Sequence, residues 1–299
     1  MVQFVDEIRT DTMNDAARKA YEDRFKRVTD YIYAHLDDEI DLNTLADIAC
    51  LSPHHWHRVY HAMRGETIAA TVKRLRLHRA AYYLATTEQP IADIAEKSGY
   101  PNLQSFNRIF KSAFGMPPAA YRKGGSHRRF LDTSRQMDIA MYDVETRTLP
   151  EMKGVGIDHT GPYITIGKAF ETLYGCLVSR GLFRPDMRMV GIYYSDPSAV
   201  PENDLKSRAC LVFEGPVAAE APLIETVIPE TRCAVLTYKG PYADMKAAYD
   251  WLFGEWLPQS GAEPGDRPCF EIYLNDSRDT PPTELLTEIC LPLKSDAAA

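Results

Sequence analysis

The sequence has no long hydrophobic run: no apolar stretch approaches the roughly 20 residues that span a bilayer. Its first ten residues, MVQFVDEIRT, also lack the basic and then apolar order of a secretory signal. The six cysteines are scattered, with no C-x-x-C pair and no histidine at zinc-finger spacing. These absences argue against a membrane protein and a zinc finger, and they favour reduced thiols in a cytoplasmic protein.

Signatures of catalysis and of metal binding are missing as well. The sequence contains no nucleophile elbow, phosphate loop or metal-ligand cluster. His57 and His61 have the i, i+4 spacing of a helical metal site, but neither has a third ligand of the Cys, Asp or Glu type beside it. We therefore expect no metal, no cofactor and no enzyme activity.

Positive charge is scarce overall, because the formal net charge is −8. Residues 50–137 nevertheless hold 14 Lys and Arg against 5 Asp and Glu, a net charge of +9. The flanking segments are acidic, with −6 over residues 1–49 and −11 over residues 138–299. A local excess of this kind is what binding to a phosphate backbone requires. The middle segment is therefore a candidate for nucleic-acid binding.

A pattern that occurs twice marks this segment. The letters WHRVYHAMRG at 56–65 match FNRIFKSAFG at 106–115 in an aromatic residue, an arginine, a second aromatic residue and a glycine. Each copy follows a short apolar helix signal, LADIA at 45–49 and IADIA at 91–95. A short helix, a tight turn and a second helix with an outward arginine is the layout of a DNA-reading helix-turn-helix. Two such units can read two major-groove segments without a dimer.

Periodicity and capping residues place the helices of this all-α region. They predict helices at 14–37, from about 43, at 53–63 and at 66–85, and a second recognition helix from 101–102 that ends before Gly115. The helix at 66–85 links the two units, and one of its faces carries Lys73, Arg74, Arg76 and Arg79. The text RKGGSHRRFLDTSRQ at 122–136 predicts an interdomain linker, and a basic arm lying along DNA is the alternative.

Beyond residue 138 the pattern predicts an α+β domain of two duplicated strand-helix-strand-strand halves. GPY at 161–163 recurs at 240–242, and GIY at 191–193 corresponds to EIY at 271–273. This repeat predicts two like halves about a pseudo-twofold axis, with a ligand cleft at their junction. Helices are expected at 164–179 and 243–256, and strands at 138–144, 155–157, 189–194, 209–213, 224–228, 233–238, 269–274 and 285–291.

Residues 22–124 resemble the DNA-binding domain of AraC/XylS transcription regulators. The resemblance covers both helix-turn-helix units, the linking-helix text RLRLHRAAYYL and the closing text PIADIAEKSGYPNLQSFNRIFKSAFGMPPAAYR. Residues 138–295 resemble the GyrI-like effector-binding domain in the two GPY turns and in CFEIYLND at 269–276. With a linker at 125–137, this is the layout of Rob-like regulators.

The resemblance implies that outward residues on the early turns of each recognition helix contact bases. In the second unit, arginine can grip guanine, and glutamine or asparagine can grip adenine. The positions in this chain are His54, His57 and Arg58 in the first unit and Leu103, Gln104, Asn107 and Arg108 in the second. Candidate phosphate contacts, which position the protein without reading sequence, are Lys73, Arg74, Arg122, Lys123, Arg128 and Arg129.

For the C-terminal domain, the resemblance places an acidic residue at the floor of an aromatic-lined pocket, which in relatives receives large, often cationic, hydrophobic compounds. Glu271 stands at that position, and a carboxylate is seldom buried without a partner. Aromatic faces around a carboxylate suit a desolvated organic cation. The candidate walls are Tyr163, Tyr193, Tyr242, Trp251 and Tyr273.

The expected function is a ligand-responsive, sequence-specific transcription regulator that acts as a monomer or a homodimer. Its expected partners are double-stranded DNA, a small-molecule effector and RNA polymerase. Two alternatives stay open for the C-terminal domain. It could bind a protein partner, or it could hydrolyse a small molecule with Glu271 and Tyr273, although fusion to a DNA reader favours sensing over turnover.

Overall fold

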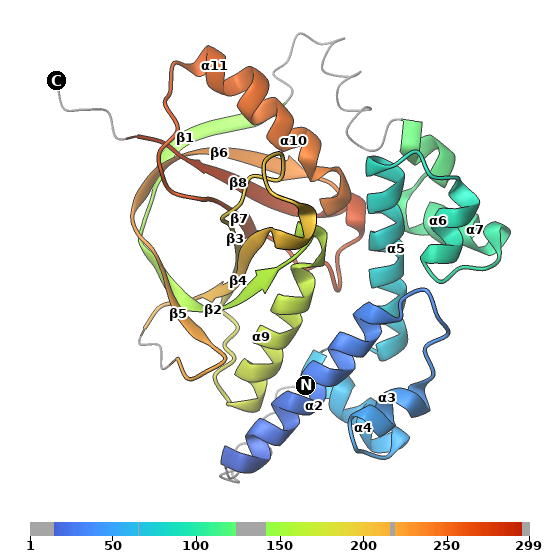
Figure 1. Cartoon of the computed structure of the whole chain (residues 1–299). Helices are drawn as coiled ribbons and strands as arrows, with labels where there is room; N and C mark the ends of the chain where they lie inside the picture. The colour runs from blue at the N-terminus through green and yellow to red at the C-terminus, as the bar shows by residue number, and fades with distance from the viewer. Residues whose placement is uncertain (1–14, 65, 124–141, 216–218, 295–299) are drawn as a thin grey trace.

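A computed structural model describes residues 15–64, 66–123, 142–215 and 219–294, apart from the side chains of residues 15–22, 54, 55, 58 and 62–64. It shows a helical N-terminal domain beside a domain built on a curved sheet (Figure 1). The predicted linker at 125–137, with Arg128 and Arg129, lies outside the described residues, as do the side chains of His54 and Arg58. Within the described ranges, no helix has the length and apolar character needed to cross a membrane.

The helices of the N-terminal domain confirm the double helix-turn-helix arrangement. α3 and α4 form the first unit, α6 and α7 form the second, and α5 links them (Figure 1). The bounds are α2 Asp15–Ala34, α3 Leu42–Ile48, α4 Pro53–Arg64, α5 Ile68–Thr86, α6 Ile91–Lys97 and α7 Leu103–Phe114.

Local chemistry explains where α7 begins and ends. The Asn102 side chain accepts a hydrogen bond from the Ser105 backbone N–H at 2.9 Å, which caps the first turn. Phe106, Phe110 and Phe114 recur every four residues and are buried, so they fix the inward face of the helix. Gly115 then adopts a left-handed conformation with φ 73° and ends the helix.

The tight turn of each unit needs a left-handed backbone, and the two units supply it differently. The second unit uses Gly99 at φ 75°, whereas the first uses Cys50 at φ 53°. Gly99 also approaches the link between the units, because a Cβ there would collide with the Leu36 carbonyl oxygen and the Arg76 guanidinium. Arg76 Nε donates to that carbonyl at 2.8 Å, so the turn packs against a fixed contact.

The C-terminal domain is an antiparallel sheet with strand order β1-β6-β8-β7-β3-β4-β2-β5 among the described residues. Helices α9 and α10 cover one of its faces (Figure 1). The strands are β1 Asp143–Leu149, β2 Met152–Thr160, β3 Arg188–Tyr193, β4 Lys206–Val212, β5 Ile224–Ile228, β6 Thr231–Lys239, β7 Cys269–Tyr273 and β8 Leu286–Pro292. The helical segments are η2 Tyr163–Thr165, α9 Gly167–Ser179, η3 Glu202–Asp204, η4 Tyr242–Asp244, α10 Met245–Trp251, η5 Leu252–Trp256, α11 Leu257–Ser260 and η6 Pro282–Glu284.

The predicted duplication is confirmed: each half is a strand-helix-strand-strand unit preceded by one additional strand, which makes the eight strands that the sequence predicted. The first half comprises β1 to β4 with α9, and the second comprises β5 to β8 with α10. The additional strands are exchanged: β1 pairs with β6 of the second half, and β5 pairs with β2 of the first. The halves join where β3 pairs with β7, and Gly191 lies directly opposite Glu271 at that junction.

Strand alternation decides what faces the junction. Val190, Ile192, Phe270 and Ile272 belong to the buried apolar cluster on one side of the sheet. Their neighbours in β3 and β7 point the opposite way, toward α9 and α10. A tyrosine from each half, with Glu271 between them, is therefore placed under the two helices, where the sequence predicted the ligand site.

Candidate DNA-reading surface and effector site

The second recognition helix presents an exposed face beside its buried phenylalanines. Leu103, Gln104, Asn107 and Arg108 are all exposed on α7, and Leu103 is 40% accessible. Helical spacing puts these four residues on one side, since they follow each other by one, three or four positions. α7 thus offers one guanidinium, two amides and an apolar side chain to a base-pair edge.

A shallow hollow of about 490 Å³ flanks this face of α7. It is lined by Ile91 at the start of α6, by Pro117 and Ala119 beyond the helix end, and by Leu103, Asn107, Arg108 and Lys111. The hollow therefore has apolar walls beside the polar side chains of Asn107 and Arg108. Such walls suit a thymine methyl group or the edge of a sugar, next to a base that the polar side chains hydrogen-bond.

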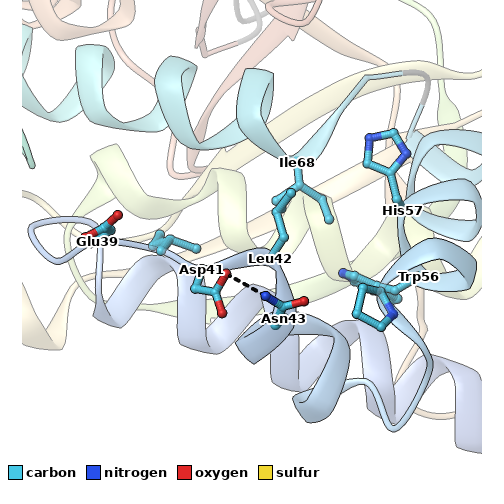
Figure 2. Close-up of a pocket in the computed structure, with 9 residues that line it drawn as sticks. Glu39, Asp41, Leu42, Asn43, Trp56, His57 and Ile68 are labelled. Carbon is cyan, nitrogen blue, oxygen red and sulfur yellow. Dashed lines mark hydrogen bonds between the residues drawn. The ribbon is translucent and has the colours of Figure 1, made fainter.

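In the first unit, α4 is held by an aromatic cluster and exposes histidines. Trp56 is 1% accessible and packs against Phe25 with ring centroids 5.0 Å apart, whereas His57 and His61 are exposed. Figure 2 shows His57 and Trp56 on one wall of a pocket of about 390 Å³. Glu39 and Asp41 lie on its other side, and Asp41 caps α3 by accepting from the Thr44 N–H at 3.3 Å. This pocket carries carboxylates, so it does not suit a phosphate.

Two of the predicted phosphate contacts are used inside the protein. Arg74 Nη2 lies 2.5 Å from Glu66 Oε1 and 3.6 Å from Glu171 Oε1 of α9, so it forms an ion-pair cluster between the domains. Arg122 donates to the Gln89 carbonyl. We correct the prediction for both residues. Lys73 and Lys123 are exposed and stay candidates.

Other arginines of the linking helix also bind carbonyl groups. Arg76 donates to the carbonyls of Leu36 and Asp38 just beyond the end of α2, and Arg79 donates to that of Lys97 at the end of α6. A cation at a helix C-terminus satisfies orphan carbonyls and complements the helix dipole. Part of the positive excess in residues 50–137 therefore holds the two units together.

Tyrosine hydroxyls converge on Glu271 at the junction of the two halves. Tyr193 and Tyr273 donate to Glu271 Oε2 at 2.9 and 2.8 Å, and Tyr249 donates to Oε1 at 2.8 Å. The hydroxyls of Tyr193 and Tyr273 also lie 2.7 Å from each other. Glu271 is 5% accessible. We call Glu271 with these three tyrosines the tyrosine cage.

Burial and hydrogen bonding oppose each other in the tyrosine cage. Burial raises the pKa of Glu271, while the hydroxyls of Tyr273, Tyr249 and Tyr193 draw it back down. Burial and the nearby carboxylate also raise the pKa of each of these tyrosines, so all three stay protonated donors. The carboxylate is therefore satisfied in this closed arrangement, and a ligand must displace hydroxyls to reach it.

The cage has the pseudo-symmetry of the duplication, with a break at its centre. Phe170 stands where Tyr249 stands in the second half, seven residues after the tyrosine of GPY. Gly191 stands where Glu271 does, and a Cβ on Gly191 would lie 3.0 Å from the hydroxyls of both Tyr193 and Tyr273. The glycine thus leaves the room in which these hydroxyls meet the carboxylate.

Of the aromatic residues predicted to line the pocket, Tyr163 and Tyr242 pack against tyrosines of the cage and Trp251 packs elsewhere. Tyr242 packs edge-on against Tyr273 at 5.5 Å, and Tyr163 packs against Tyr193 at 4.8 Å, with its hydroxyl donating to the Ser195 carbonyl. Trp251 instead packs against Tyr142 at 5.2 Å, so we correct its assignment as a pocket wall. The sequence analysis missed Tyr249. Its position, seven residues after the tyrosine of the second GPY, was the signal that would have found it.

Among the residues that the structure describes, no three His, Cys, Asp or Glu side chains are grouped so as to hold a metal ion.

Comparison with protein families identifies both domains. Residues 142–294 match the family described as a GyrI-like small molecule binding domain. The chain belongs to the GyrI-like family. Residues 45–124 match a helix-turn-helix domain, so the GyrI-like domain follows an AraC-type DNA-binding domain.

Curated relatives match part of the chain. The bifunctional transcriptional activator/DNA repair enzyme AdaA of Bacillus subtilis is 35% identical over 96 residues, which cover 32% of this chain and 46% of AdaA. The right origin-binding protein of Escherichia coli K12 is 30% identical over 159 residues, 53% of this chain and 51% of that protein. The chain spans about half the length of these two relatives. Among solved structures, the C-terminal domain of EcmrR aligns with a TM-score of 0.44 at 19% identity, over 52% of this chain and 100% of that domain.

Proposed function

We propose that this protein is a transcription regulator that reads DNA with α4 and α7 and responds to a hydrophobic cation bound by its GyrI-like domain. The observation that carries the proposal is the buried carboxylate of Glu271 in a ring of tyrosines, within a chain that also holds two helix-turn-helix units. A carboxylate among aromatic faces favours an organic cation by charge pairing and by cation–π attraction.

For DNA reading, we propose that α4 and α7 enter successive major-groove segments about 34 Å apart. α5 sets their separation, since it runs between the two units (Figure 1). The proposed base contacts on α7 are Leu103, Gln104, Asn107 and Arg108, and those on α4 are His54, His57 and Arg58. Lys73 and Lys123 are the proposed phosphate contacts. Because α5 fixes the separation of the two recognition helices, the DNA should bend to bring both major-groove segments into contact with them.

The DNA-reading proposal is tested on a duplex that the intact protein selects from random DNA. Arg108→Ala should weaken binding to this duplex by about 1–3 kcal/mol and leave binding to random DNA nearly unchanged. Lys111→Ala is the matched control, one turn away on the same helix, and should change both affinities by the same factor. Equal losses for Arg108→Ala on both duplexes would count against a base contact.

The ligand proposal is tested by calorimetry with tetraphenylphosphonium and with neutral triphenylphosphine oxide, which has a related shape. Glu271→Gln keeps the size of the side chain and removes its charge. The variant should bind the cation roughly tenfold more weakly and the neutral compound with little change, because only the cation pairs with the carboxylate. Equal effects on both compounds would refute the role of Glu271.

We propose that the GyrI-like domain binds its ligand without converting it. The tyrosines of the cage stay protonated and donate to Glu271, which leaves the arrangement without an activated nucleophile among the described residues. Product formation that is abolished by Glu271→Gln and Tyr273→Phe would favour the hydrolase instead. RNA polymerase as a partner and action as a monomer or homodimer both stay predictions. Sedimentation of the protein with and without promoter DNA and polymerase tests them.

A further inference from the structure

One short segment of the GyrI-like domain, η4, contacts the DNA-binding domain through three consecutive residues. The Tyr242 ring lies edge-on to His78 of α5, with centroids 5.7 Å apart. Ala243 is 5% accessible and belongs to the apolar core of the second unit. Asp244 Oδ1 accepts a hydrogen bond from the Tyr121 hydroxyl at 2.8 Å, and both side chains are buried.

The equivalent turn of the first half is used differently. In η2, Tyr163 donates to the Ser195 carbonyl, and Thr165 bonds to His159 and to the Pro162 carbonyl. These partners all belong to the GyrI-like domain itself. The duplication therefore supplied two like turns, of which η4 is the one built into the DNA-binding domain.

Tyr121 connects η4 to the second recognition helix. Its ring lies edge-on to Phe110 at 5.3 Å and to Phe114 at 5.2 Å. These phenylalanines form the buried face of α7, the helix that also exposes Asn107 and Arg108. A shift of Tyr121 therefore changes the packing that positions the recognition helix α7.

The other end of η4 belongs to the ligand site. Tyr242 packs against Tyr273, whose hydroxyl donates to Glu271 in the tyrosine cage. Burial and the charge of Glu271 both raise the pKa of Tyr242. A ligand that displaces the Tyr273 hydroxyl therefore acts on the ring against which Tyr242 is packed.

We propose that η4 couples the tyrosine cage to the second recognition helix, with Asp244 and Tyr121 as positioning residues for α7 and Tyr242 as the link to the cage. This inference rests on the proposed function and adds a route by which ligand binding at the cage changes DNA binding by α7. The path runs from Tyr273 to Tyr242 by ring contact and along the short η4 backbone to Asp244. From Asp244 it continues through the buried Tyr121 to Phe110, so a displacement at Tyr273 has a continuous physical route to α7. Coupling of this kind changes affinity by about 5- to 150-fold in other proteins and acts equally in both directions.

The first experiment measures how strongly the intact protein prefers its selected duplex over random DNA. Tyr121→Phe removes the hydroxyl that Asp244 holds and should lower this preference about tenfold. Asp244→Asn keeps an acceptor for the hydroxyl and should retain most of it, whereas Asp244→Ala should match Tyr121→Phe. Thr165→Val is the control on the equivalent turn of the first half and should leave the preference unchanged.

The second experiment follows the coupling itself and needs no ligand. Tyr242 is replaced by 3-fluorotyrosine, and its fluorine resonance should shift when the selected duplex is added to the otherwise unchanged protein. In the Tyr121→Phe background this shift should vanish, although the duplex is still bound at saturating concentration. A purely structural role for Tyr121 would leave the shift in place.

A third measurement adds tetraphenylphosphonium and should change the affinity for the selected duplex in the unchanged protein and not in Tyr121→Phe. Two results together would overturn the coupling. The fluorine resonance at position 242 would stay unchanged when DNA is added, and Tyr121→Phe would lose the same affinity for the selected and the random duplex. Selective DNA binding by the unchanged protein would still support the proposed function in that case. A protein that selects no duplex would overturn both.

Discussion

Replacing Arg74 with methionine tests the ion-pair cluster between the linking helix and α9. Arg74 approaches Glu66 at 2.5 Å and Glu171 at 3.6 Å, and the accessible fractions of the three side chains are 24%, 10% and 14%. Although burial disfavours its charge, the hydrogen bond to Glu66 and the charges of Glu171 and Glu66 raise the pKa of Arg74 above its ordinary value. Methionine preserves the length of the stem and removes the cation that both carboxylates approach.

The expected cost follows from this burial. Exposed ion pairs contribute about 0–1 kcal/mol, whereas breaking a buried pair costs about 3–5 kcal/mol because an uncompensated charge remains. Arg74 is about three-quarters buried and its partners more so, which places the loss at about 2–4 kcal/mol.

Chemical denaturation and the salt dependence of DNA binding together decide the outcome. Arg74→Met should lower the free energy of unfolding and leave the salt slope of nonspecific binding nearly intact. Lys73 is adjacent and exposed, so Lys73→Met should change the free energy of unfolding by less than about 0.5 kcal/mol. It should instead reduce the salt slope of nonspecific DNA binding by about 0.9. An Arg74→Met protein of unchanged stability with a reduced salt slope would refute the ion-pair assignment.

Two further predictions concern His78 and the tight turns. Burial and the charge of Arg74 lower the pKa of His78 to about 4, so between pH 6.5 and 4 the unfolded chain binds a proton that the folded protein does not. The free energy of unfolding should fall by up to about 3 kcal/mol as the pH drops through this window, and pH-dependent melting of His78→Phe should lack that contribution. Gly99→Ala should cost about 3 kcal/mol, because it combines a left-handed backbone with a collision, whereas Cys50→Gly should stabilise the first unit by up to about 1 kcal/mol in thermal melts.

The helices and the duplicated halves were predictable because each rests on local patterns. Phenylalanines at 106, 110 and 114 mark one face of a helix in any context, and the recurring GPY and GIY/EIY texts mark the repeat. The exchange of β1 and β5 between the halves was not predictable, since alternation identifies a strand and says nothing of its partner. Charge counting failed at Arg74 and Arg76 for a similar reason: their partners are far away in the sequence.

Two aromatic residues of one helix show where site prediction reached its limit. Glu271 was found through the family resemblance and the repeat, and Tyr249 was available from its offset after GPY. Trp251 lies two residues after Tyr249, which is about 200° around a helix, so the two side chains leave α10 on opposite sides. Tyr249 therefore donates to Glu271 while Trp251 packs against Tyr142.

The departures from symmetry explain how a duplicated domain can give a directional response. A ligand on the pseudo-twofold axis of a symmetric domain would act equally on both GPY turns. Two carboxylates at positions 191 and 271 would also face each other across paired strands, where like charges destabilise the sheet. Glycine at 191 removes that repulsion and makes room for the tyrosine hydroxyls. The second half thus holds both the charge, at Glu271, and the docked turn, η4. The first half supplies space and aromatic walls at the site and contacts the DNA-binding domain through α9. In the coupling that we propose, a bound cation acts on α7 through the second half, because η4, which holds Tyr121, belongs to that half.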